Sequence, residues 1–151
     1  MTRLGAAFKQ SENLRIKTFE LAGQIFRVRI PLTKEMEAME ERIKEIDQQK
    51  FDVRYEKMIS GLNKDVETEG VVFTDDDVII DGRSTKDIVK ISLQFESRVV
   101  EFIKLLIPME GTLDDITYEE IDAEWPMSVQ IDLLGKISDV IQPGYKEERK
   151  N

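Results

Sequence analysis

A long run of apolar residues at intervals of three and four constrains the fold of this chain more than any other feature. The run consists of Ile88, Ile91, Phe95, Val99, Phe102, Ile103 and Leu106. This spacing returns to one side of an α-helix on every turn, so it predicts an amphipathic helix. Ser84, followed three residues later by Asp87, is typical of a helix start, and we expect Pro108 to stop the helix. As the most hydrophobic predicted helix, it should form the centre of the core.

Residues 16–30 predict a β-hairpin. Apolar residues alternate with arginines over residues 26–30, which gives one buried side and one side facing water. A two-residue turn at Ala22-Gly23 would pair the flanking strands and place Phe19 opposite Phe26.

A second apolar stripe predicts a helix over about residues 34–60, capped by Thr33. The stripe is formed by Met36, Met39, Ile43, Ile46 and Val53. At 1.5 Å per residue this helix would be roughly 40 Å long, which is unusual in a globular protein. It therefore either breaks near residues 48–50 or packs part of its stripe against another chain.

The remaining segments are shorter. Residues 71–80 predict a second small hairpin or a structured loop, residues 117–124 a short helix, and residues 126–142 a last helix that begins at a proline. The predicted fold is mainly α (α+β), with an N-terminal β-hairpin followed by a bundle of three to four helices. The expected organisation is a flexible segment over 1–15, a single domain over 16–142 and a disordered charged tail over 143–151.

The chain contains no histidine and no cysteine. This removes the commonest general base and the commonest ligands of zinc and other transition metals. No glycine-rich phosphate-binding motif is present. The acidic run at 75–77 is explained as a solvated turn, because Ile79 stands where an EF-hand calcium loop requires an oxygen ligand. We therefore predict a non-enzymatic protein with no catalytic residue, cofactor or metal site.

The net charge is −9, which disfavours nucleic-acid binding, and no stretch approaches the ~20 apolar residues of a membrane span. The charge is uneven, at +4 over residues 1–30 and −8 over residues 110–142. These regions are either solvated faces, or the basic end of one copy docks on the acidic end of another and builds a ring or spiral. The second interpretation assigns self-association to Arg15, Arg27, Arg29, Glu119, Glu120 and Glu124.

Methionine and tryptophan supply the candidates for binding another protein. Methionine side chains adapt to varied partners, and tryptophan is enriched at binding hot spots, although both also fill cores. The candidate residues are Met36, Met39, Ile43 and Ile46 on the second stripe, and Trp125 and Met127 at the break before the last helix.

Three stretches of the chain carry a family pattern: residues 19–32 (FELAGQIFRVRIPL), residues 78–84 (VIIDGRS) with the helix that follows, and residues 113–130. In this order they resemble the tail assembly chaperones of long-tailed, lambdoid siphovirus bacteriophages. The resemblance covers roughly residues 16–150 and consists of hydrophobic and turn patterns.

This resemblance implies a protein of the infected host's cytoplasm that is absent from the mature virion. Such chaperones bind the tape measure protein, keep it soluble while the tail tube polymerises, and self-associate. A longer, frameshifted form commonly recruits the tail tube protein. The family has no motif that names binding residues. The alternative function is a structural head–tail connector or tail-completion subunit of the particle.

Overall fold

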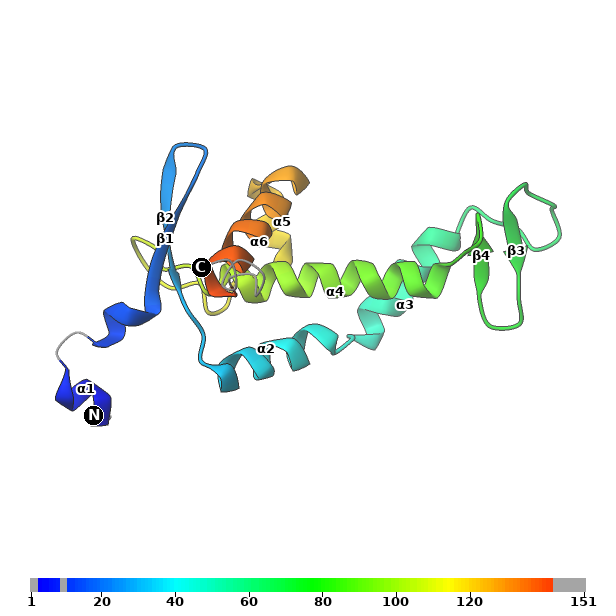
Figure 1. Cartoon of the computed structure of the whole chain (residues 1–151). Coiled ribbons are helices and arrows are strands. Elements are labelled where there is room, and N and C mark those ends of the chain that lie inside the picture. The colour runs from blue at the N-terminus through cyan, green and yellow to red at the C-terminus, as the bar shows by residue number, and fades with distance from the viewer. Residues whose placement is uncertain (1–2, 9–10, 143–151) are drawn as a thin grey trace, which may run out of the picture. The chain divides into compact units, whose positions relative to one another are not determined.

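The computed structural model describes residues 3–8 and 11–142 (Figure 1). The fold is α+β, as expected, with helices and two small antiparallel sheets. The chain divides into two compact units: unit 1 is Met1–Glu40 with Arg98–Asn151, and unit 2 is Glu41–Ser97. The single domain over 16–142 stays a prediction. The division falls inside helices α2 (Thr33–Lys44) and α4 (Thr85–Ile103). The tail expected over 143–151 lies outside the described residues.

Unit 1 begins with two short helical segments, where the sequence predicted only a flexible lead-in. These are α1 (Arg3–Ala7) and the 3₁₀-helix η1 (Ser11–Arg15). Strands β1 (Ile16–Leu21) and β2 (Gln24–Arg29) then form the predicted hairpin. The register places Phe19 opposite Phe26, and their rings stack with centroids 5.2 Å apart.

The hairpin turn has the geometry that the two-residue loop requires. Ala22 has a φ of 53° and Gly23 a φ of 79°. Two successive positive φ values define the type I′ turn, whose twist matches that of the flanking strands. Glycine adopts this conformation freely, whereas alanine is strained in it.

The prediction that α4 continues to Pro108 is wrong. The helix ends at Ile103, and the following residues lie beside β2 as a short extended segment. The Arg29 N–H donates to the Leu105 carbonyl at 2.9 Å, and the Ile107 N–H donates to the Arg27 carbonyl at 2.8 Å. These bonds pair backbone N–H and carbonyl groups on the edge of β2 that faces away from β1. In addition, Ile107 precedes Pro108, and the residue before a proline disfavours the helical conformation.

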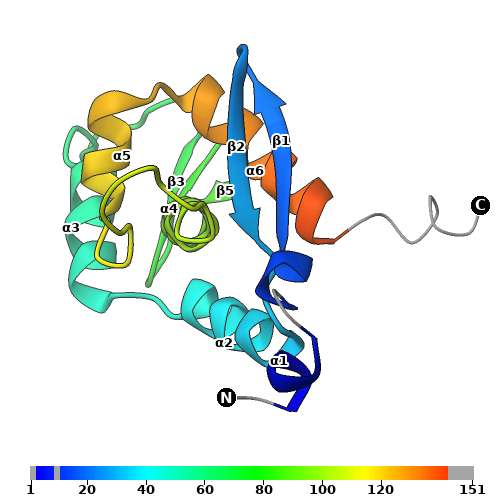
Figure 2. The ribbon, with the colours of Figure 1, turned by 90° about the vertical axis from the view of Figure 1, so that its left-hand side faces the viewer.

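Helices α5 (Tyr118–Glu124) and α6 (Met127–Ile141) complete unit 1. Helix α6 packs against the hairpin, chiefly against β1 (Figure 2). Its buried side consists of Gln130, Leu133, Ile137 and Ile141, whereas Val129 and Val140 are only half-buried. The other buried apolar residues of unit 1 are Phe19, Val28, Met39, Val99, Phe102, Ile103, Leu106 and Ile121.

In unit 2 the long predicted helix is broken, which confirms the first of the two alternatives. Asp47 separates α2 from α3 (Gln48–Ile59) and caps α3, because its carboxylate accepts the N–H groups of Gln49 and Lys50 at 3.0 and 3.2 Å. A small sheet follows, with strands β3 (Val71–Phe73), β4 (Val78–Ile80) and β5 (Arg83–Ser84) in that order.

The Asp77 carboxylate joins this sheet to the helices of unit 2. It accepts hydrogen bonds from the N–H of Val78 at 2.7 Å, the N–H of Lys86 at 3.2 Å and the Tyr55 hydroxyl at 3.2 Å. It also accepts one from the Ser84 hydroxyl. Burial raises the pKa of Asp77, but the hydrogen bonds outweigh it and leave the pKa below its ordinary value.

Candidate interaction surface

The corner between α5 and α6 is built by local capping. Thr117 caps α5, the short helix predicted over residues 117–124, by accepting the N–H of Glu120 at 3.3 Å. At the other end, the N–H of Trp125 donates to the Ile121 carbonyl at 2.8 Å. Pro126, with a φ of −65°, then starts α6. Trp125 is therefore held at a sharp turn between two helices.

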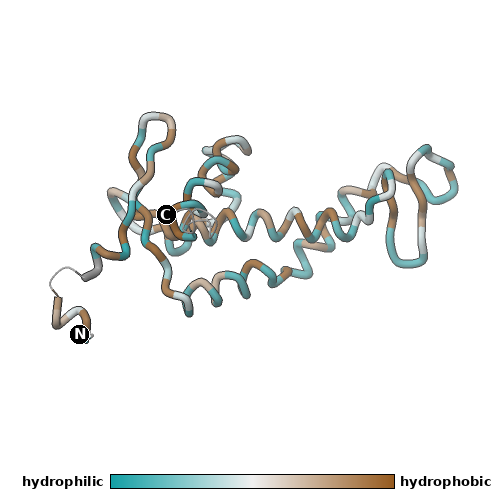
Figure 3. The backbone as a smooth tube through the Cα atoms, in the orientation of Figure 1, coloured by the Kyte–Doolittle hydropathy of each residue, from teal (hydrophilic) through white to brown (hydrophobic). Residues whose placement is uncertain are grey.

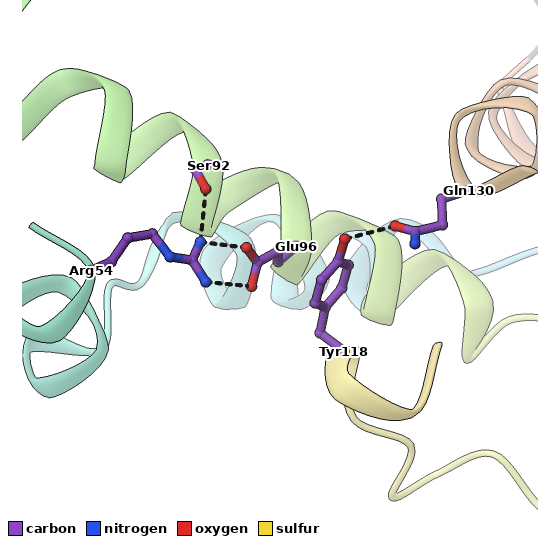
Figure 4. Close-up of polar contacts among 5 residues, drawn as sticks. All are labelled: Arg54, Ser92, Glu96, Tyr118 and Gln130. Carbon is purple, nitrogen blue, oxygen red and sulfur yellow. Dashed lines mark hydrogen bonds and ion pairs between the residues drawn. The ribbon is translucent and has the colours of Figure 1, made fainter. Parts of the chain in front are cut away.

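A buried glutamine, which sequence reasoning missed, fixes this corner. Gln130 is fully buried and accepts a hydrogen bond from the Tyr118 hydroxyl at 2.8 Å (Figure 4). Its amide group donates to the Asp122 carboxylate at 3.0 Å and to the Trp125 carbonyl at 2.8 Å. Its spacing could have indicated that it is buried, because Gln130 stands three residues before Leu133 on the buried side of α6.

The outer side of the corner exposes apolar side chains. Met127 is 48% exposed and Ile131, one turn later, is 53% exposed, while Trp125 is half-buried. Residues four apart lie on the same side of a helix, so Met127 and Ile131 are neighbours. Ile131 was not predicted. The exposed acids in residues 119–132 are Glu119, Glu120, Asp122, Glu124 and Asp132. We call Trp125, Met127 and Ile131 the α5–α6 corner.

The stripe proposed on α2 is less accessible than expected. Met39 and Ile43 are only 4% and 2% exposed, so both are core side chains in this conformation. Met36 and Ile46 are half-buried. The core-filling interpretation of these residues therefore applies to Met39 and Ile43, and an open binding stripe along α2 is absent.

Of the basic residues proposed for self-association, Arg15 already has partners within the chain. Its guanidinium pairs with Glu35 at 2.6 Å and donates to the Ile30 carbonyl at 3.1 Å. Glu35 also accepts a hydrogen bond from the Leu32 N–H at 2.8 Å. The N-terminus of α2 is therefore capped by the Glu35 carboxylate and not, as the sequence predicted, by Thr33. That backbone hydrogen bond is the main reason why the pKa of Glu35 is lowered.

The other proposed charges are accessible. Arg27 and Arg29 are exposed on the hairpin, and Glu119, Glu120 and Glu124 are exposed on α5. Their pairing between two copies of the chain stays a prediction.

A surface cavity of about 290 Å³ lies elsewhere in unit 1. Its lining consists of Arg29, residues 104–108 and residues 111–114. The two cations in this lining do not define an anion site, because Lys104 pairs with Glu101 at 3.4 Å and Asp114 lies in the same wall. Over the described ranges, no group of three or more acidic side chains could hold a metal ion.

No protein-family model, curated protein or solved structure matches the chain. Among the residues that the structure describes, no helix is both long and apolar enough to cross a membrane. The α5–α6 corner is a partly apolar surface that the hydrogen bonds of Gln130 hold in place.

Proposed function

We propose that the protein is a phage tail assembly chaperone that binds the tape measure protein through the α5–α6 corner. It would act in the host cytoplasm, keep the tape measure protein soluble and leave before the virion is complete. A longer form of the chain would bring in the tail tube protein.

The observation that carries this proposal is the exposure of Met127 and Ile131 on a corner that Gln130 holds rigid. Exposed apolar side chains on a fixed scaffold favour binding, because little conformational entropy is lost when a partner docks. The acids of the same region add charge, which keeps a complex with an apolar partner in solution. The resemblance of the sequence to tail assembly chaperones agrees with this chemistry.

The test is co-expression with the tape measure protein of the same phage genome. We expect the chain to raise the soluble fraction of the tape measure protein several-fold and to co-purify with it. Met127→Glu and Ile131→Glu together should remove this effect. The matched control is Ile25→Glu on the hairpin, which is 69% exposed and lies outside the corner.

Two results would contradict the proposal. The first is a tape measure protein whose solubility does not change with the wild-type chain. The second is detection of the chain by mass spectrometry in purified particles at the copy number of a structural subunit, which would favour a head–tail connector or tail-completion role.

A further inference from the structure

The β-hairpin of unit 1 is covered on one side and along one edge. Helix α6 packs against one side of it (Figure 2), and residues 105–107 bond to the edge of β2. The other edge belongs to β1, which pairs with β2 without a bulge from Ile16 to Leu21 and contains no proline. Bulges and prolines are two of the devices that keep a sheet edge from pairing with another strand, and β1 has neither. Figure 3 shows apolar and polar positions interspersed along both strands.

The hydrogen bonds of β2 show which backbone groups of β1 point outward. Arg27 and Arg29 bond to residues 105–107, so their backbone groups point away from β1. Within the hairpin, Arg27 lies opposite Thr18. In an antiparallel pair, two opposite residues either bond to each other or both point outward, and the two arrangements alternate along the strand. The N–H and carbonyl groups of Thr18 and Glu20 therefore point away from β2.

These outward groups are accessible. Thr18 and Glu20 are both exposed, whereas Ile16, the other outward residue of β1, is half-buried. Over residues 3–8 and 11–142, no hydrogen bond from outside the hairpin reaches the backbone of Thr18 or Glu20. Backbone N–H and carbonyl groups form hydrogen bonds wherever a partner is available, so this part of β1 can accept a further strand.

We propose that β1 pairs antiparallel with β1 of a second copy of the chain, so that the two hairpins form one continuous sheet. The register follows from the accessible groups. Thr18 of each copy lies opposite Glu20 of the other, and the two residues of each such pair exchange both of their backbone hydrogen bonds. A two-fold axis then passes between the Phe19 residues of the two copies. Both copies use the same surface, as a closed dimer requires.

The charges on the outer side of the sheet fit this register. Arg27 lies opposite Thr18 within the hairpin, and Glu20 of the second copy would lie on the other side of Thr18. Arg27 and that Glu20 would then be two strands apart, about 10 Å between their Cα atoms, with only the short side chain of Thr18 between them. Both side chains are exposed and long enough to meet across Thr18. Over the described ranges neither has an ion-pair partner within its own chain.

The inner side of the sheet, which faces α6, is also complementary to itself. Phe19 would lie opposite Phe19 of the second copy and extend the stack that it forms with Phe26, whose ring centroid is 5.2 Å away. Lys17 would lie opposite Leu21 of the second copy. Aromatic pairs across neighbouring strands stabilise a sheet, and like charges directly opposite each other destabilise it. Because the register contains the first and avoids the second, it favours a second copy over an unrelated strand.

This inference goes beyond the proposed function. The edge of β1 is separate from the α5–α6 corner, and its pairing requires no tape measure protein. It also differs from the docking of Arg27 and Arg29 on the acids of α5, because it forms a closed dimer through free backbone groups and does not involve α5.

The first test measures the mass of the full chain by analytical ultracentrifugation over a range of concentrations. We expect a dimer, with twice the 17.5 kDa of one chain. Thr18→Pro removes an outward N–H and leaves the N–H groups that bond to β2 in place, so it should weaken dimerisation at least tenfold. Thr18→Val keeps that N–H and a branched side chain, and should dimerise as the wild type does. Circular dichroism checks that both variants are folded.

Disulfide cross-linking tests the register. The chain contains no cysteine, so Thr18→Cys and Glu20→Cys each introduce a single thiol. Opposite residues of a hydrogen-bonded pair have Cα atoms about 5.5 Å apart, a separation that suits a disulfide. Under mild oxidation, a mixture of the two variants should form linked dimers at least fivefold faster than either variant alone.

Charge reversal tests the contact between Arg27 and Glu20. Glu20→Arg should weaken the dimer at least fivefold, because it would bring two arginines together across Thr18. Arg27→Glu in the same chain should restore the dimer, since opposite charges would meet again. Glu110→Arg makes the same change of net charge at an exposed position after α4, and should leave the dimer unchanged.

Three outcomes would overturn the inference. The first is a wild-type chain that is monomeric at every concentration measured. The second is a dimer that folded Thr18→Pro leaves unchanged, which would show that the copies meet through another surface. The third is cross-linking of Thr18→Cys alone as fast as the mixture, which would contradict the register. The proposed function fails separately, through the co-expression test and the Met127 and Ile131 variants.

Discussion

The hydroxyl of Tyr118 donates to the side-chain oxygen of Gln130 at 2.8 Å, and this bond links the first turn of α5 to the buried side of α6. Gln130 in turn holds the carbonyl of Trp125. Because the amide is fully buried, each of its hydrogen bonds forms away from competing water. The position of the α5–α6 corner therefore depends on one uncharged side chain.

We expect Gln130→Leu to destabilise the protein by about 2–3 kcal/mol, because it removes the three hydrogen bonds that the buried amide makes to Tyr118, Asp122 and the Trp125 carbonyl. Tyr118→Phe removes only one of these bonds and should cost about 1 kcal/mol. Urea denaturation measures both. The control is Gln49→Leu, since Gln49 is exposed on α3. Equal effects of Gln130→Leu and Gln49→Leu would show that the buried bonds contribute nothing.

The hairpin turn offers a stabilising substitution. Ala22 holds a φ of 53°, a conformation that asparagine and glycine adopt more readily than alanine. Ala22→Asn should therefore raise the free energy of unfolding by about 0.5–1 kcal/mol. The turn Asp81-Gly82 provides the matched comparison, because Asp81 has a φ of 51° and already suits it. Asp81→Ala should lower stability by a similar amount, and a loss of stability in Ala22→Asn would contradict the strain argument.

The Asp77 carboxylate predicts a pH dependence of stability. Because the folded state lowers its pKa below the ordinary value of 3.8, the ionised group stabilises the fold above that pH. This contribution is lost as the pH falls through the lowered pKa. Asp77→Asn should reduce stability near pH 7 and flatten the stability curve between about pH 5 and 2. Asp75→Asn, at an exposed position of the same turn, should leave the curve near that of the wild type.

Two arginine–glutamate pairs that differ in exposure show how burial changes the strength of an ion pair. In the pair Arg54–Glu96 the side chains are 33% and 19% exposed, and in the pair Arg98–Glu40 they are 41% and 36% exposed. Double-mutant cycles with leucine at each position should give a coupling of about 1–2 kcal/mol for the first pair and less than about 1 kcal/mol for the second. The reverse order would show that the Arg54 contacts do not hold α3 against α4.

Local patterns predicted the elements of this fold well. The alternation around Ala22-Gly23 predicted the hairpin and its register, and Thr117 predicted the start of α5. Both depend on contacts within a few residues. The end of α4 could not be predicted in the same way, because Leu105 and Ile107 leave the helix to bond with β2, which lies far away in the sequence.

The candidate site was predicted only in part. Trp125 and Met127 lie at an accessible corner, but Met39 and Ile43 are buried. A stripe of apolar residues on a helix shows which side is apolar and not what covers that side. For the same reason the stripe on α4 suggested a core position for Ile91, which is exposed in unit 2. The spacing of Gln130 alone places it on the buried side of α6, but a polar residue is expected to be buried only where hydrogen-bond partners await it, and those partners are visible only in the structure.

Self-association through opposite charges gives the last prediction. Arg27 and Arg29 are exposed on the hairpin and Glu119, Glu120 and Glu124 are exposed on α5, whereas Arg15 is paired with Glu35 and should not contribute. If the basic side of one copy docks on the acidic side of another, Arg27→Glu with Arg29→Glu should lower the mass measured by light scattering. Added salt should lower that mass as well, because it screens exposed charges.

A charge swap separates this specific contact from a general effect of charge. Glu119→Lys with Glu124→Lys should also lower the mass when made alone, but should restore it when combined with the two arginine reversals, since the pairing is then reversed in sign and kept in place. Lys34→Glu with Lys136→Glu changes the net charge equally at exposed positions outside the proposed contact, and should have little effect. A chain that stays monomeric at every salt concentration has no such contact, and the acids of α5 would then serve only to bind a partner or to face water.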